Sequence, residues 1–224
     1  MTGWNQGDSW LHYDYVHDIS YVYVNIPKNA SSWMKENFGG FKFDRINNLF
    51  LSEVSSIITA QRGLIAPKKY LVILRDPVSR WLSGFAQHFW EWDPLHIGHY
   101  AHQPADFWFQ TVNFDEHTRP QIHFLHELDY ENTIWFDCDA NLIDNVKSWM
   151  AGKFDHKIEG LDNNLDNRYN VTDRTPGKYG VSKQQVIDHV QSVLDCNPAY
   201  KQKLLDFYQE DIALRKSVEF YGTR

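Results

Sequence analysis

The chain has 224 residues with 42% hydrophobic content, enough for one sizeable core, so we expect a single domain over residues 1–224. A net charge of −7 argues against a nucleic acid as partner. No apolar run approaches the roughly 20 residues of a membrane span, and residues 1–18 lack the apolar core of a signal peptide. We therefore expect a cytoplasmic protein that binds no membrane. Cys138 and Cys196 fit neither a metal site nor a disulfide framework.

Residues 1–18 are expected to form an N-terminal arm without chemistry. Residues 21–24 are aromatic and β-branched, which predicts a buried strand, and a helix is predicted over residues 33–38. The turn between them carries Lys28 and two serines. Unpaired N–H groups at a helix start, together with hydroxyl groups and a lysine, favour an anion. An ordinary turn, with Ser32 as N-cap and Lys28 in solvent, would explain the same residues.

The most apolar strand is predicted at residues 70–74 and leads into a helix. Asp76 can cap that helix, and Pro77 suits its first turn. Arg75 comes at the carboxyl end of the strand, the edge at which open α/β sheets bind ligands. Apolar residues recur along the helix at helical spacing and predict its buried face: Val78, Trp81, Leu82, Phe85 and Phe89.

These two elements resemble the nucleotide-binding motifs of sulfotransferases that use 3′-phosphoadenosine 5′-phosphosulfate (PAPS). The loop that resembles their 5′-phosphosulfate site is Pro27-Lys28-Asn29-Ala30-Ser31-Ser32-Trp33. The segment that resembles their 3′-phosphate motif is Arg75-Asp-Pro-x-x-Arg80-x-x-Ser83. The motifs occur in the family's order, each after a predicted strand.

The resemblance implies a P-loop-NTPase-like sulfotransferase fold, with PAPS as donor, its desulfated form PAP as product, and no metal. The alternation of strands and helices itself predicts a three-layer α/β/α domain with a mainly parallel sheet. Lys28 would be catalytic, because it would stabilise the charge on the leaving oxygen. Ser31 and Ser32 would hold the 5′-phosphate, and Arg75 the 3′-phosphate. Ser83 would assist Arg75, and Arg80 would join them or pair with a carboxylate.

A third segment, residues 115–121, reads Asp-Glu-His-Thr-Arg-Pro-Gln. It resembles the His-x-x-Pro-Gln segment of the carbohydrate sulfotransferase branch, which implies a glycan acceptor; another small molecule stays open. Imidazole is suited to accepting a proton near neutral pH, so His117 is the predicted base. Glu116 is the alternative base.

Two further stretches have open interpretations. His96, His99 and His102 have the spacing of a loose metal site, but no carboxylate or cysteine pattern completes it. We expect them to pack or to line the acceptor site. The polar stretch 152–180 is predicted to be a loop over the nucleotide, with Arg174 and Lys178 near a phosphate or in solvent.

The remaining elements are predicted from periodicity and caps. We expect a short strand and then a helix over residues 53–60, a short helix at 105–112, a strand at 132–136 and a helix at 140–150 capped by Asp139. Ser182 and Gln185 form a capping box that opens a helix to about residue 194, and Pro198 begins a single last helix.

Two rival functions fit parts of the pattern. A P-loop kinase acting on a small molecule would need ATP, Mg²⁺ and a Gly-Lys-Ser/Thr ending, which residues 27–33 lack. A non-catalytic nucleotide-binding protein would not need Lys28, which is present.

Overall fold

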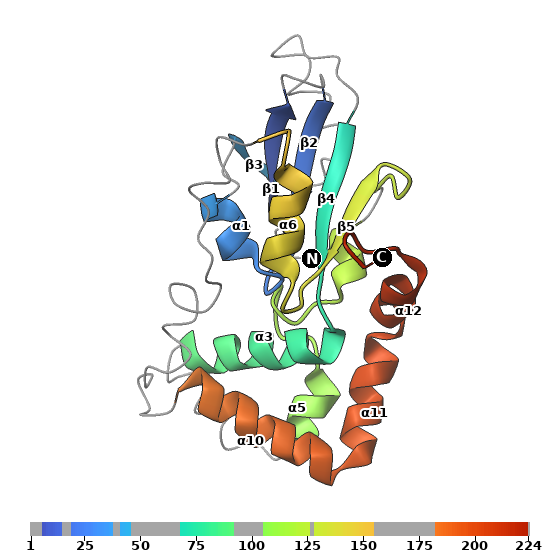
Figure 1. The fold of residues 1–224 in the computed structure, drawn as a ribbon. Helices are drawn as coiled ribbons and strands as arrows, with labels where there is room; N and C mark the ends of the chain where they lie inside the picture. The colour runs from blue at the N-terminus through green and yellow to red at the C-terminus, as the bar shows by residue number, and fades with distance from the viewer. Residues whose placement is uncertain are drawn as a thin grey trace. The chain divides into compact units, whose positions relative to one another are not determined.

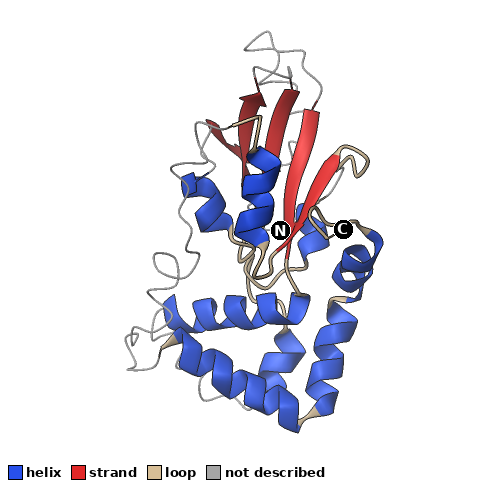
Figure 2. Ribbon diagram, viewed as in Figure 1, coloured by secondary structure: helices blue, strands red, loops and turns tan. Residues whose placement is uncertain are grey.

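The structure is a computed structural model, and it describes residues 6–14, 19–37, 41–45, 68–91, 105–125, 128–154 and 182–223. These residues form a mixed α/β protein (Figure 2). Two compact units divide the chain. The sheet unit comprises residues 1–75, 121–163 and 217–224, and the helical unit comprises residues 76–120 and 164–216. The expected single domain stays a prediction.

In the described residues, the sheet unit contains five strands in the order β3-β1-β2-β4-β5 (Figure 1). They are β1 (Gln6–Asp14), β2 (Ile19–Val24), β3 (Phe41–Arg45), β4 (Lys68–Leu74) and β5 (Thr133–Asp137). The expected parallel pairing is present in β2, β4 and β5. β1 pairs antiparallel with both β2 and β3.

β1 corrects the expected N-terminal arm. Its sequence, QGDSWLHYD, mixes polar and aromatic residues and has no clean alternation of apolar and polar positions. Strand formation depends strongly on the pairing partner. Here β2 and β3 supply that partner on both sides, which the local pattern did not reveal.

β4 is an interior strand of the sheet. Tyr70 through Leu74 are all buried, as expected for a parallel strand that is covered on both faces. Tyr21 of β2 and Phe136 of β5 both contact Trp149, with ring centroids 5.0 and 6.0 Å away. Trp149 belongs to α6 (Leu142–Met150), so α6 covers one face of the sheet (Figure 1).

The start of α6 and the C-terminal segment complete this unit. Asp139 accepts a hydrogen bond from the Asn141 amide (2.9 Å), but the N-cap is Asn141, so the helix begins two residues later than predicted. The C-terminal segment pairs with β5 through a parallel bridge between Trp135 and Phe220 and a bond from the Tyr221 amide to the Trp135 carbonyl (2.8 Å).

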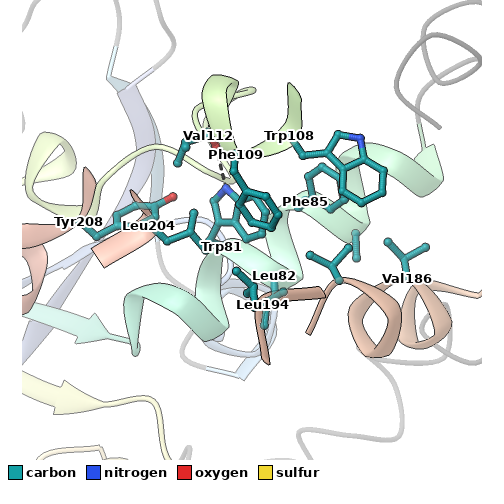
Figure 3. Packing of buried hydrophobic residues seen from close by; sticks show 12 residues of the cluster. Trp81, Leu82, Phe85, Trp108, Phe109, Val112, Val186, Leu194, Leu204 and Tyr208 are labelled. Carbon is teal, nitrogen blue, oxygen red and sulfur yellow. Dashed lines mark hydrogen bonds between the residues drawn. The ribbon is translucent and has the colours of Figure 1, made fainter. Parts of the chain in front are cut away.

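The helical unit contains α3 (Pro77–Glu91), α5 (Ala105–Thr111), α10 (Lys183–Cys196), α11 (Pro198–Phe207) and α12 (Gln209–Ser217). Aromatic side chains from α3 and α5 form the centre of its core (Figure 3). The rings of Trp81 and Phe85 stack at 5.1 Å, and Phe109 lies 5.4 Å from Trp81. Trp81 also donates its ring N–H to the Val112 carbonyl (2.8 Å).

The predicted helix caps are confirmed in two places. Asp76 accepts a hydrogen bond from the Ser79 amide (2.8 Å), and Ser182 and Gln185 form both bonds of the capping box. The single last helix is wrong, because the structure breaks it at Tyr208 into α11 and α12. Tyr208 is the C-cap of α11, and its side chain is buried and donates its hydroxyl to the Thr118 carbonyl.

Several predictions fall outside the described residues. They are the helix at 53–60, the cluster of His96, His99 and His102, and nearly all of the loop at 152–180. In the part of the chain that the structure describes, no helix has the length and apolar character needed to cross a membrane.

Candidate functional site

The turn after β2 carries the residues that resemble a phosphosulfate loop. The following helix, α1, spans Ser31–Asn37 and so begins two residues before the predicted start. Ala30 accepts the first helical hydrogen bond, from the Met34 amide (3.0 Å). Ser31 and Ser32 therefore lie in the first turn, and Ser32 is not the N-cap. Lys28 and Ala30 have φ of 69° and 56°, a strained region for residues other than glycine.

Asn29 fixes this turn from inside. Its side chain is fully buried, and its Nδ2 donates to the Ile73 carbonyl (2.7 Å) and to Oε1 of Gln121 (2.6 Å). Its Oδ1 is buried and has no hydrogen-bond partner among the residues that the structure describes. Asn29 thus ties the turn to the end of β4, so its side chain has a structural contact where the sequence predicted a nucleotide ligand.

Gln121 holds the residue that follows β4. Its Oε1 accepts from the Arg75 amide (3.0 Å), and its Nε2 donates to the Arg75 carbonyl (2.9 Å). The side chain is fully buried at the start of a short 3-10 helix, η1 (Gln121–Phe124). Our sequence prediction did not include Gln121 among the site residues, although its place after Pro120 in the third motif was a signal.

Lys28 and Arg75 come together at one edge of the sheet. β2 and β4 are parallel neighbours, so the segments after their carboxyl ends emerge at the same edge. The guanidinium of Arg75 donates through Nη1 to the Lys28 carbonyl (3.1 Å). Both residues are half-buried, and this bond joins positions 47 apart in the sequence.

The other predicted residues of the loop differ in exposure. Pro27 and Ser31 are half-buried, and Ser32 is exposed. Trp33 is 1% exposed and belongs to the core of the sheet unit. The serine hydroxyls are thus available to a ligand, whereas the Trp33 ring is not.

In the helical unit, His117 pairs with Asp115. Nδ1 of His117 lies 3.1 Å from Oδ2 of Asp115, and the His117 amide donates to Oδ1 (2.8 Å). The carboxylate selects the tautomer with a proton on Nδ1, which leaves the lone pair on Nε2. The two side chains are 26% and 13% exposed, so Nε2 belongs to a partly accessible imidazole suited to accepting a proton. Our prediction missed Asp115, for which the Asp-x-His spacing was the available signal.

Arg80 has a different place from the one expected. Its side chain is fully buried and donates to the carbonyls of Arg119 (2.5 Å) and Glu116 (3.0 Å). These bonds hold the segment that carries His117, as does the Tyr208 hydroxyl, whose pKa is raised by burial so that it stays a donor. Main-chain carbonyls accept these two bonds, and the expected phosphate or carboxylate partner of Arg80 stays a prediction. Ser83 is half-buried on α3, and its phosphate contact stays a prediction.

The segment around His117 also contains other ionisable groups. Burial lowers the pKa of Arg119, and the carboxylates of Glu116 and Asp115 oppose that shift. Asp115, Glu116 and His117 each offer one possible metal-ligand atom, all within 4.8 Å of one another. Asp115 is buried and Glu116 is exposed, and the expected absence of a metal stays a prediction.

No protein-family model matches the chain, and no curated protein or solved structure matches it at a significant level. The likeness to sulfotransferases therefore depends on the motifs and on the geometry described above.

Proposed function

We propose that this protein is a sulfotransferase that transfers a sulfuryl group from PAPS to a hydroxyl group. Because the third motif resembles that of carbohydrate sulfotransferases, we propose that the hydroxyl group belongs to a carbohydrate. The proposal includes the finer fold: a P-loop-like, three-layer sulfotransferase architecture. The first support is the mixed sheet, in which β2, β4 and β5 are parallel. The two motifs begin at the carboxyl ends of the adjacent strands β2 and β4.

One observation carries the proposal: the hydrogen bond from the Arg75 guanidinium to the Lys28 carbonyl at 3.1 Å. A doubly phosphorylated nucleotide needs cations at two places that one molecule can span. Because β2 and β4 are parallel neighbours, the segments that follow them share one edge of the sheet, and this bond brings Lys28 and Arg75 into contact there. The main chain of Lys28 and the side chain of Arg75 do meet, so one nucleotide can contact both residues.

Lys28 acts on the leaving group. In the transfer, the bond from sulfur to the bridging oxygen breaks, and negative charge grows on that oxygen, by analogy with phosphoryl transfer. The Lys28 ammonium stabilises this charge, and the hydroxyls of Ser31 and Ser32 hold the 5′-phosphate. Arg75 binds the 3′-phosphate through charge-assisted hydrogen bonds, and Ser83 is assigned to the same phosphate.

His117 acts on the acceptor. As the new bond forms between sulfur and the acceptor oxygen, the hydroxyl proton passes to Nε2 of His117. Asp115 stabilises the imidazolium that results. We give the role to His117 rather than to Glu116 because Asp115 orients the His117 ring. Arg80 acts only by holding this segment.

The rival functions make different demands. A P-loop kinase would place a glycine-rich loop and a metal around ATP. In this chain the strained positions of the loop are Lys28 and Ala30, with no glycine among residues 27–33. A non-catalytic nucleotide-binding protein would bind PAP and yet transfer no sulfate.

The test is sulfate transfer from labelled PAPS to a panel of glycan and small-molecule acceptors, with Lys28→Ala as the variant. We expect turnover to fall by about 10²- to 10³-fold, as when one preorganised group is removed from a transition state. Lys147→Ala removes the same charge from α6 of the same unit and should leave turnover unchanged. Near-normal transfer by Lys28→Ala would exclude this mechanism, and absence of transfer by the unaltered protein would favour the binding protein.

A further inference from the structure

We infer that Asn29 and Gln121 are positioning residues that make the two ends of the donor bind cooperatively. The inference rests on the proposed function and deepens it, because it assigns a role to two buried amides that contact no substrate. These two side chains, here called the amide pair, link the Lys28 turn to Arg75.

The hydrogen bonds of the amide pair fix each other's orientation. If Asn29 were flipped, its Oδ1 would face two oxygens, those of Ile73 and Gln121. If Gln121 were flipped, its Nε2 would face two N–H donors, those of Asn29 and Arg75. Either flip would replace attraction by repulsion, so only one arrangement satisfies both amides.

This arrangement connects the two phosphate-binding segments by three hydrogen-bonded routes, two of which start at the Asn29 side chain. Asn29 donates to the Ile73 carbonyl at the end of β4. It also donates to Gln121, whose side chain is hydrogen-bonded to the main chain of Arg75. The third route is the bond from Arg75 to the Lys28 carbonyl. A nucleotide that contacts Lys28 and Arg75 therefore meets both groups already in place, and its second phosphate costs little further ordering.

Two features argue that stability alone does not explain the amide pair. Asn29 leaves its Oδ1 buried and without a hydrogen-bond partner among the described residues, and an unsatisfied buried polar atom in general lowers stability. The turn that Asn29 holds has two non-glycine residues with positive φ. Backbone strain that the surroundings maintain is typical of sites whose geometry serves binding.

The experiment compares binding of PAP and 5′-AMP, which lacks the 3′-phosphate, by calorimetry on the full chain. Gln121→Glu keeps an oxygen for Asn29 and for the Arg75 amide but can no longer donate to the Arg75 carbonyl. We expect the affinity advantage of PAP over 5′-AMP to fall at least about tenfold, with 5′-AMP affinity changed less than about threefold. Asn37→Ala removes a bond to the Trp33 carbonyl in the same unit, and it should change neither the affinity for PAP nor the affinity for 5′-AMP.

Asn29→Ala provides a second variant that adds no buried charge and should reduce the same ratio, so a Gln121→Glu protein that fails to fold does not end the test. Equal weakening of PAP and 5′-AMP would indicate a purely structural role and overturn the inference. Affinities for PAP and 5′-AMP that both match those of the unaltered protein would overturn it as well. In either case, PAP binding by the unaltered protein would leave the proposed function standing. If the unaltered protein bound no PAP, the proposed function and this inference would both be wrong.

Discussion

Lys28 and Ala30 adopt left-handed backbone angles without being glycine. Each such residue costs roughly 1–2 kcal/mol, so the surrounding contacts must hold the turn in place. Asn29 between them supplies these contacts, because its amide donates to Ile26 (3.2 Å) and its side chain to Ile73 and Gln121. A single buried asparagine thus determines where the Lys28 carbonyl meets Arg75.

The pair of Asp115 and His117 gives a prediction at the residue scale. In Asp115→Asn the amide can donate toward Nδ1 and favours the wrong imidazole tautomer, so Nε2 loses its lone pair. The rate of sulfate transfer at pH 7 should fall about 10²- to 10⁴-fold, with the KM for PAPS unchanged. The check is a kcat profile from pH 5.5 to 9, and equal profiles for both proteins would show that Asp115 does not orient the base.

Asp129 gives a second prediction. The pKa of Asp129 is lowered chiefly by the hydrogen bond that the Asn132 side chain donates to its carboxylate (2.7 Å). Desolvation opposes this shift, and the amides of Asn132 and Glu131 add smaller contributions that lower the pKa. A lowered pKa in the folded state means that the contribution to stability is present above the usual carboxyl pKa. That contribution is lost as the pH falls through the lowered value.

Removing the side-chain donor with Asn132→Ala should therefore raise the pKa of Asp129 toward its ordinary value. Carboxyl chemical shifts followed by NMR between pH 2 and 6 measure this directly. Asn141→Ala, in the turn before α6, is the control and should leave the Asp129 titration unchanged. A pKa of Asp129 that stays low in Asn132→Ala would mean that the main-chain amides alone cause the shift.

At the scale of elements, α3 and the segment that carries His117 approach closely at Gly84. A Cβ on Gly84 would overlap the carbonyl group of His117, whose carbon would lie 2.7 Å away. Gly84→Ala should thus destabilise the protein by about 1–3 kcal/mol, although the same change in an unobstructed helix stabilises by about 1 kcal/mol. The check is the sign of the change in the free energy of unfolding, measured in urea, with Ser79→Ala on the exposed face of α3 as reference.

The elements that the sequence predicted well are those with strong local signals. β2 and β4 are apolar runs, and α10 begins with a capping box between residues three apart. The break at Tyr208 has no such local signal, and the contact that its side chain makes there is with Thr118, 90 residues away.

The candidate site divides in the same way. Lys28, Arg75 and His117 were found from local motifs, and their partners were not. Asn29 and Gln121 meet across 92 residues, and polar amides in turns ordinarily face solvent. Arg80 was expected to face a ligand because it lies off the apolar stripe of α3. Its burial depends on two carbonyl acceptors 36 and 39 residues further on.

At the scale of the whole molecule, the two compact units are interleaved along the chain. The sheet unit takes three separate segments and the helical unit takes two. Residues 1–75 alone would lack β5 and the Gln121 that grips Arg75. Each test of nucleotide binding therefore requires the full chain.

The central claim is that Lys28 and Arg75 serve one doubly phosphorylated nucleotide. The most direct measurement is a calorimetric titration of the full chain with PAP in the absence of metal, in parallel with ATP and Mg²⁺. We predict saturable PAP binding that is tighter than ATP binding and that Arg75→Ala weakens about 10- to 100-fold. Saturable binding of ATP only with Mg²⁺, together with no binding of PAP, would contradict the account.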